Sequence, residues 1–190
     1  MWITDLTMKI ENLASEKEMF YKIAAGYYRD VIEKEIVLAN IGCDDHILCI
    51  GGGLCPFSAI LFHQATGAKV TVIDNKAECI SKAQEVISRI GIEGHVQVLY
   101  SDGRNIDALP CMFSEYTVVH FALQVYPLDS VFSHVEALAA PGTKILLRRP
   151  KKRLAELYSK LPALGSCPFT EHKRACNIGS TLLYIRPIRA

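Results

Sequence analysis

The 190-residue sequence lacks the patterns that mark several common classes of protein. Its seven cysteines include no Cys-x-x-Cys pair, so neither a zinc knuckle nor a thioredoxin-like redox site is predicted. So many scattered thiols favour a reducing compartment. No long apolar window is free of charge, and Asp and Glu interrupt residues 1–20, so neither a membrane span nor a signal peptide is expected. These absences predict a cytoplasmic protein that needs no metal.

The sequence also has almost no net charge, with a formal value of +1. It therefore lacks the field that would draw it to nucleic acid or to an anionic membrane. One basic run, Arg-Arg-Pro-Lys-Lys-Arg at 148–153, has no stacking aromatic beside it, which favours a solvated corner over an RNA-binding surface. The same positive rim could attract an anionic small substrate. We expect the protein to act on a small molecule as its acceptor substrate, and to bind neither a membrane nor nucleic acid. A homo-oligomer is left open.

What the sequence does contain is apolar residues, which make up 50% of it and suffice for a sizeable core. Short β-branched runs alternate with segments of helical length, which is the pattern of a parallel sheet with helices on both faces. We expect a single α/β domain with an N-terminal helical cap (1–42) and a Rossmann-like core (43–190). The predicted strands are 46–50, 68–74, 95–101, 115–123, 143–149 and 180–187, and the predicted helices are 55–66, 76–90, 130–140 and 153–161, after one long or two shorter helices within 8–39.

Three consecutive glycines, Gly51, Gly52 and Gly53, follow the first predicted strand. Glycine accepts positive φ and lets a ligand approach the backbone, and such turns in parallel sheets are where ligands bind. Pro56 suits the first turn of the next helix. It also stands where the dinucleotide pattern G-x-G-x-x-G needs its last glycine, which disfavours NAD, and no G-K-[ST] follows to make an ATP loop. A structural turn without a ligand is the alternative.

Acidic residues end the next two predicted strands. Asp74 closes the second and could accept hydrogen bonds from both ribose hydroxyls of an adenosine; alternatively, Asp74 or Asn75 caps the following helix. The third strand ends in Ser101, Asp102 and Gly103, where a carboxylate could take the adenine amino group or could simply close a turn. The glycine turn and the two carboxylates together are more specific than any one of them.

In these motifs, ILCIGGG, VTVID and VLYSDG, the sequence resembles the class I S-adenosylmethionine-dependent methyltransferases, from about Asp45 to Pro187. The resemblance implies a mostly parallel seven-stranded sheet with a late antiparallel strand. It also implies that Gly51 and Gly53 face the methionyl part of the cofactor, while Asp74 binds the ribose and Asp102 the adenine. The full set of implied cofactor residues is Gly51, Gly52, Gly53, Pro56, Asp74, Asn75, Ser101, Asp102 and Gly103. Tyr21, Tyr27 and Tyr28 could close over the cofactor or serve the core or an interface.

A finer resemblance is to the nicotianamine synthase-like branch, in the stretch 51–74 with Pro56 and Ser58, and in NIGSTLLYI at 177–185. Those enzymes transfer the aminocarboxypropyl group of S-adenosylmethionine and not its methyl group. We predict an S-adenosylmethionine-dependent methyltransferase of a small molecule. The alternatives are an aminocarboxypropyl transferase and a non-catalytic nucleotide-binding domain. His120, Gln124 and Tyr126, near the end of the fourth strand, are the candidates to serve the acceptor as a base or as pocket lining. Core burial is the alternative for His120 and aromatic packing for Tyr126, and no catalytic residue is assigned.

Overall fold

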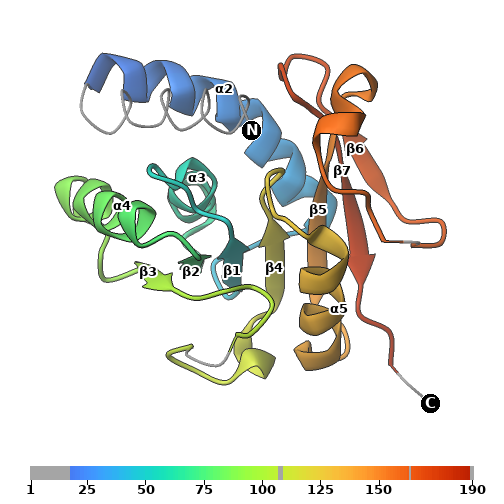
Figure 1. The fold of residues 1–190 in the computed structure, drawn as a ribbon. Helices are drawn as coiled ribbons and strands as arrows, with labels where there is room; N and C mark the ends of the chain where they lie inside the picture. Colours follow the sequence, from blue (N-terminus) through green and yellow to red (C-terminus); the bar gives the residue numbers. More distant parts are fainter. Residues whose placement is uncertain (1–17, 107–108, 163, 189–190) are drawn as a thin grey trace.

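The computed structural model describes residues 18–106, 109–162 and 164–188, with side chains from residue 25 onwards (Figure 1). Seven strands form one sheet in the order β3-β2-β1-β4-β5-β7-β6. All neighbours pair in parallel except the last strand along the chain, which runs antiparallel to both of its partners. The mostly parallel seven-stranded sheet is thereby confirmed. The strands are β1 (His46–Ile50), β2 (Lys69–Asp74), β3 (Val96–Tyr100), β4 (Val118–Phe121), β5 (Lys144–Pro150), β6 (Phe169–Glu171) and β7 (Ile178–Ile185).

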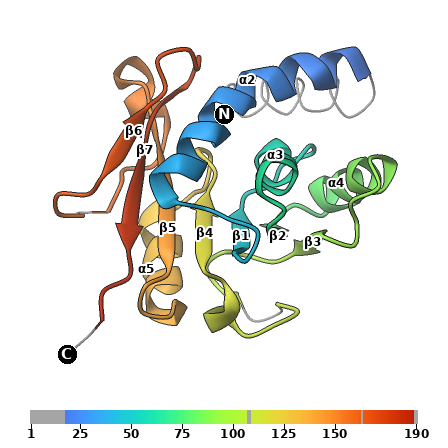
Figure 2. The ribbon, with the colours of Figure 1, turned by 180° about the vertical axis from the view of Figure 1, so that it is seen from behind.

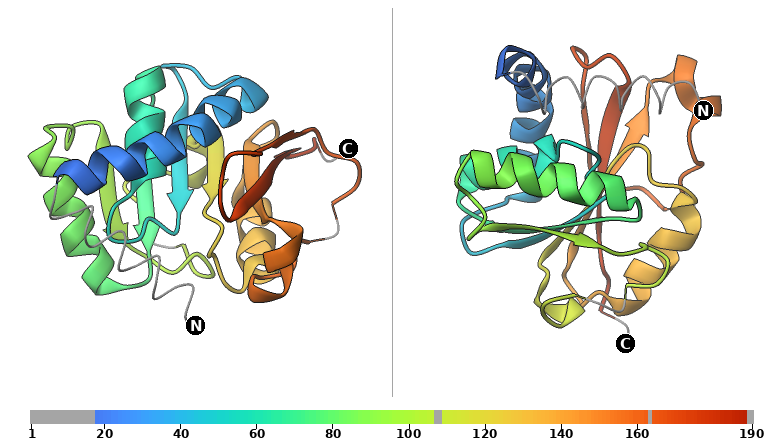
Figure 3. Two further views of the ribbon diagram at one scale, coloured as in Figure 1. Left: turned by 90° about the horizontal axis from the view of Figure 1, so that it is seen from above. Right: turned by 60° about the vertical axis from the view of Figure 1, so that its left-hand side comes forward.

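Helices cover both faces of the sheet (Figure 3). They are α2 (Glu18–Ala39), α3 (Phe57–Thr66), α4 (Ala77–Arg89) and α5 (Leu128–Leu138), with 3-10 turns η1 (Phe113–Glu115) and η2 (Lys152–Leu157). Because successive side chains of a strand point to opposite faces, Ile47 packs with α2, α3 and α4, whereas Leu48 packs with α5. Figure 2 shows α2 crossing the face of the sheet near β5 and β7. Helices on both faces were expected, and the structure confirms them.

The ends of several elements differ from the sequence prediction. Gly42 does not end the first helix: Asn40 takes the left-handed conformation, with φ 47°, and the Ile41 amide donates to the Ile36 carbonyl at 3.1 Å. This is the closure that glycine usually provides and asparagine can also adopt. The helix predicted at 153–161 is the 3-10 turn η2. The part of the predicted N-terminal helix before residue 18 lies outside the described residues.

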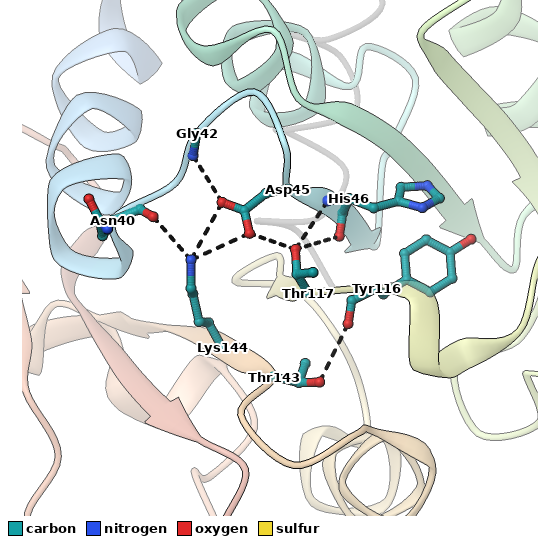
Figure 4. A network of polar contacts seen from close by, with 8 residues as sticks. All are labelled: Asn40, Gly42, Asp45, His46, Tyr116, Thr117, Thr143 and Lys144. Atoms are coloured by element: carbon teal, nitrogen blue, oxygen red, sulfur yellow. Dashed lines mark hydrogen bonds and ion pairs between the residues drawn. The ribbon is translucent and has the colours of Figure 1, made fainter.

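A polar network ties together the amino-terminal ends of β1, β4 and β5 (Figure 4). Lys144 donates to the Asn40 carbonyl at 3.0 Å and contacts both Asp45 oxygens at 3.4 Å. Asp45 also accepts from the Thr117 hydroxyl at 2.6 Å. Burial alone would raise the pKa of Asp45, but hydrogen bonds from Thr117 and the Gly42 amide and the charge of Lys144 lower it. Side-chain hydrogen bonds therefore link the strands at the amino-terminal edge of the sheet.

The opposite, carboxyl-terminal edge is open where the strand order reverses. The chain builds β1, β2 and β3 in one direction and then returns to place β4 on the other side of β1. The loops after β1 and β4 consequently diverge, which leaves the crevice in which parallel sheets bind ligands. None of the helices in the described ranges is long and apolar enough to span a membrane.

Candidate active site

A cavity of about 320 Å³ lies at this carboxyl-terminal edge. Its walls come from the loops after β1, β2, β3 and β4, from α2 and from β5. Every residue that the sequence assigned to a cofactor lines it: Gly51, Gly52, Gly53, Pro56, Asp74, Asn75, Ser101, Asp102 and Gly103. The structure therefore brings together residues that lie up to about fifty positions apart in the sequence.

The glycine turn after β1 requires glycine for two separate reasons. Gly51 and Gly53 have φ of 86° and 64°, in the region that side chains rarely adopt. Gly52 has an ordinary backbone conformation, but a Cβ there would lie 2.3 Å from Val72 Cγ1. Pro56 occupies the N-cap position of α3 and not its first turn, because the helix begins at Phe57, two residues later than predicted. The glycine turn therefore packs closely against β2. Because its three residues have no side chains, its backbone faces the cavity directly.

Asp74 joins the glycine turn to the next helix. Its Oδ2 accepts a hydrogen bond from the Gly53 amide at 2.9 Å, and its Oδ1 accepts one from the Lys76 amide at 3.0 Å. The two roles that the sequence left open for Asp74 are therefore compatible, since each carboxylate oxygen has a second lone pair for a ligand. Asn75 lines the cavity but does not cap α4, whose N-cap position is Lys76.

Asp102 is partly engaged by a residue that the sequence analysis did not consider. Arg104 donates from Nη2 to Asp102 Oδ2 at 2.6 Å and from Nε to Oδ1 at 3.1 Å. This side-chain hydrogen bond lowers the pKa of Asp102. Beside it, Ser101 is buried, and a Cβ on Gly103 would lie 2.8 Å from Val131 Cγ1. The sequence signal for the pair of Asp102 and Arg104 is that a basic residue follows the acidic one by two positions in a predicted turn.

A buried ion pair lies at the other end of the cavity, which its arginine, Arg148, lines. Arg148 from β5 donates through Nε and Nη2 to the two oxygens of Glu35 from α2, both at 2.8 Å. Glu35 also accepts from Thr181 of β7 at 2.6 Å, and Arg148 Nη1 donates to Ser58 Oγ of α3 at 3.0 Å. His120 of β4 lies with Nε2 3.6 Å from Glu35 Oε2. One carboxylate thus links α2, β4, β5 and β7.

The charge states in this network follow from its burial. Burial alone would raise the pKa of Glu35, but the Arg148 charge and hydrogen bonds outweigh it and hold the pKa well below its usual range. Burial, with Arg148 nearby, lowers the pKa of His120, so its imidazole is neutral at pH 7. Burial raises the pKa of the Cys49 thiol to about 12. The inner wall therefore carries one compensated ion pair, a neutral imidazole and a neutral thiol.

The tyrosines of the N-terminal helix divide between the two roles considered from the sequence. Tyr28 lines the cavity, stacks on Phe57 with ring centroids 5.5 Å apart, and lies 5.8 Å from the Arg148 guanidinium carbon. Tyr27 instead donates to Asn177 Oδ1 at 2.6 Å and accepts from the Cys176 amide at 2.9 Å. The side chain of Tyr21 lies outside the described residues.

Arg148 also corrects the interpretation of the basic run. The six residues 148–153 were predicted to form a solvated corner, but Arg148 is only 5% exposed and reaches into the cavity. The sequence signal for the burial of Arg148 was its position on the fifth predicted strand, because alternate residues of such a strand face a layer of helices. Among the described residues, no group of three or more His, Cys, Asp and Glu side chains is arranged to hold a metal ion.

The sheet order, the inserted antiparallel strand and the cavity at the reversal point define the Rossmann-like fold of the class I methyltransferases. Searches for a matching family model or curated protein find none. Among solved structures, the chain is similar to a point mutant of the nicotianamine synthase MtNAS in complex with S-adenosylmethionine. The TM-score is 0.78 and the identity 21%, over 98% of this chain and 76% of that one.

A second solved structure is the RNA methyltransferase from Salinibacter ruber in complex with S-adenosyl-L-homocysteine. Its TM-score is 0.65 at 15% identity, over 85% of this chain and 93% of that one. A third, a putative sarcosine dimethylglycine methyltransferase from Galdieria sulphuraria, has a TM-score of 0.56 at 16% identity and covers 64% of this chain and 46% of that one. The Rossmann-like fold that the sequence resemblance implied is confirmed, and the similar structures include both methyltransferases and the nicotianamine synthase MtNAS.

Proposed function

We infer that this protein is an S-adenosylmethionine-dependent transferase that acts on a small-molecule acceptor, with methyl transfer as the first candidate reaction. One observation carries the proposal: the glycine turn, Asp74 and Asp102 surround a single cavity, and Asp74 is hydrogen-bonded to the turn. The similar structures with bound S-adenosylmethionine or S-adenosyl-L-homocysteine support the same ligand. A cytoplasmic location and a single-domain organisation belong to this proposal, and the seven free cysteines support the location.

The residues of the cavity fit such a ligand. The turn at 51–53 exposes backbone where a side chain would otherwise stand, and the remaining lone pairs of Asp74 suit the two ribose hydroxyls. Asp102 keeps acceptor capacity for an adenine amino group beside its pair with Arg104. His120 lines the same cavity, and neither of its ring nitrogens has a hydrogen-bond partner among the described residues, so this end also suits a polar ligand group.

The reaction asks the protein mainly for positioning. When bound, S-adenosylmethionine supplies a sulfonium that makes its attached carbons electrophilic. The cavity must then align an acceptor nucleophile and exclude water, which is catalysis by proximity and orientation. Gln124 and Tyr126 follow β4 and line the cavity beyond His120, so they are candidates to contact the acceptor. Tyr126 is 77% exposed and stands at the rim.

A second candidate reaction is transfer of the aminocarboxypropyl group. The fold likeness to MtNAS over 98% of the chain supports it, since nicotianamine synthases transfer that group. The two reactions release different products from the same ligand. Methyl transfer leaves S-adenosylhomocysteine, whereas aminocarboxypropyl transfer leaves methylthioadenosine.

Mass spectrometry of the split ligand tests both candidates. The purified protein is incubated with S-adenosylmethionine and a pool of small metabolites, with Asp74→Ala as the matched control. Accumulation of S-adenosylhomocysteine supports methyl transfer, and accumulation of methylthioadenosine supports the second candidate. Tight binding without either product would favour a non-catalytic binding domain. Failure to bind S-adenosylmethionine would refute the proposed function itself.

A further inference from the structure

Arg148 has donors that the protein does not use. Its guanidinium carries five N–H groups, and the hydrogen bonds to Glu35 and Ser58 account for three of them. No further acceptor for Arg148 is found among the described residues. One N–H remains on each terminal nitrogen, and the side chain lines the cavity while only 5% exposed. Buried donors of this kind are normally satisfied, so a ligand acceptor is expected there.

The guanidinium lies close to the glycine turn although Arg148 belongs to a different strand. Ser58, which accepts its Nη1 hydrogen bond, is in the first turn of α3, five residues after Gly53. Cys49 of β1 pairs in register with His120 of β4, and both line the cavity with Arg148. Arg148 therefore reaches back from β5 to the region above β1 and β4.

This position matches the length of the proposed ligand. Asp74 ends β2, and two strand spacings, about 10 Å, separate β2 from β4. A ligand whose ribose sits on Asp74 spans that distance with its sulfur and three-carbon chain. The group at the far end of that chain in S-adenosylmethionine is an aminocarboxylate.

The charge of the inner wall also suits that group. Glu35 already balances Arg148, so an extra buried negative ligand would remain uncompensated. An aminocarboxylate is a zwitterion and adds no net charge. His120 lies beside the pair, is fully buried, and has no hydrogen-bond partner at either ring nitrogen within the part of the chain that the structure describes, which indicates that a second polar group binds there.

We propose that Arg148, held in place by Glu35 and Ser58, binds the carboxylate at the methionyl end of S-adenosylmethionine. The inference rests on the proposed function and extends it, because it assigns a residue of β5 to the ligand's charged end. It holds for either transferred group, because the carboxylate is present in both reactions. Tyr28, over the guanidinium, covers the same end of the cavity.

The test compares two ligands that differ only in that carboxylate, S-adenosylmethionine and its decarboxylated form, by calorimetry without acceptor. Wild type is expected to prefer the carboxylate form at least tenfold. Arg148→Lys keeps a charge but loses the planar donor pair, and we expect the preference to fall at least fivefold. Arg149→Lys, the neighbour on β5, is the matched control and keeps the preference.

The ratio of the two affinities within one variant is independent of the fraction of folded protein. If Arg148→Lys destabilises the fold, the double variant Glu35→Gln with Arg148→Gln removes both charges and provides the same comparison. A preference that stays unchanged in both variants, while wild type binds both ligands, overturns this inference alone. Binding of neither ligand by wild type overturns the proposed function and the inference together.

Discussion

Single residues that line the cavity can combine a structural task with the ligand-binding task that we propose for them. Asp74 illustrates this, since its two oxygens hold the glycine turn and the start of α4 before any ligand arrives. A residue of this kind is preorganised, because the protein's own amides fix its carboxylate in one orientation. Helix capping and ribose binding were alternative roles for Asp74 in the prediction from the sequence. The sequence cannot decide between these roles, because it does not show which groups lie beside the carboxylate.

Asp74→Ala is expected to weaken binding of S-adenosylmethionine by about 1–3 kcal/mol, the usual cost of a lost charged hydrogen bond. Calorimetry measures the change directly. Asp44→Ala, in the exposed turn before β1, is the control and should leave affinity unchanged. Equal affinities in wild type and Asp74→Ala would remove the ribose assignment.

His120 is expected to make the protein sensitive to mild acid. Burial, then Arg148, lowers its pKa in the folded state, while nearby Glu35 opposes this. The unfolded chain therefore binds a proton more readily, so the stabilisation is complete above about pH 6.5 and is lost as the pH falls through the lower, folded value.

Chemical denaturation between pH 7 and pH 5 tests this expectation. One histidine contributes a slope of at most about 1.4 kcal/mol per pH unit, and His120→Gln should flatten the curve by up to that amount. His172 is buried behind Thr181, and its lowered pKa leaves a residual slope in the variant. His95→Gln, at an exposed position, is the control. A variant as acid-sensitive as wild type would contradict the neutral state assigned to His120.

Gly52 is required by packing and not by backbone conformation. Gly52→Ala should destabilise the protein by about 1–3 kcal/mol, because the new Cβ would overlap Val72 Cγ1. Thermal unfolding measures the loss. The double variant with Val72→Ala removes the clashing methyl group and should be less affected than the sum of the two single changes. Additive losses would show that the Cβ does not meet Val72.

At the scale of elements, the alternation of apolar runs and helical segments was sufficient to predict six of the strands. The buried strands were found because both of their faces are largely covered, which makes most of their residues apolar. β6 was missed because its three residues, Phe169–Glu171, are largely exposed and carry no apolar pattern. The segment of the 3-10 turn η2 was assigned as a helix because it has helical composition. None of its residues is buried, so no packing against the core stabilises a longer α-helix there.

The α2 helix offers a test that does not involve the cavity. Gly26 is exposed within the helix, has an ordinary backbone conformation, and a Cβ there would meet nothing within 4 Å. Gly26→Ala should stabilise the protein by about 0.5–1 kcal/mol through helix propensity alone. The midpoint of thermal unfolding should therefore rise. A lower midpoint would contradict the open space beside Gly26, because it would mean that the new methyl group meets another part of the protein.

At the scale of the whole molecule, the sequence indicated one half of the cavity and not the other. The glycine turn and the two acids follow strands that are consecutive in the chain, so their meeting could be foreseen. Glu35 and Arg148 are 113 positions apart, and each alone resembles an ordinary charged residue on a helix or in a basic run. Only the packing of α2 across β5 and β7 unites them.

Ligand binding should stabilise the molecule as a unit. S-adenosyl-L-homocysteine at about 100 times its dissociation constant should contribute about 2.7 kcal/mol, or a rise in Tm of about 5–10 °C for a chain of this length. Differential scanning fluorimetry measures the shift. Adenosine diphosphate at the same concentration is the comparison ligand, and a larger shift with it would favour a different nucleotide.

The carboxylate of Glu35 is neutralised by groups that the ribosome makes much later. Until β5 and β7 have been synthesised, a nascent chain carries Glu35 without Arg148 or Thr181. Burying the carboxylate would then be unfavourable, because nothing compensates its charge. Because Arg148 follows Glu35 by 113 positions, a chain terminated before β5 would carry this carboxylate without its counter-charge.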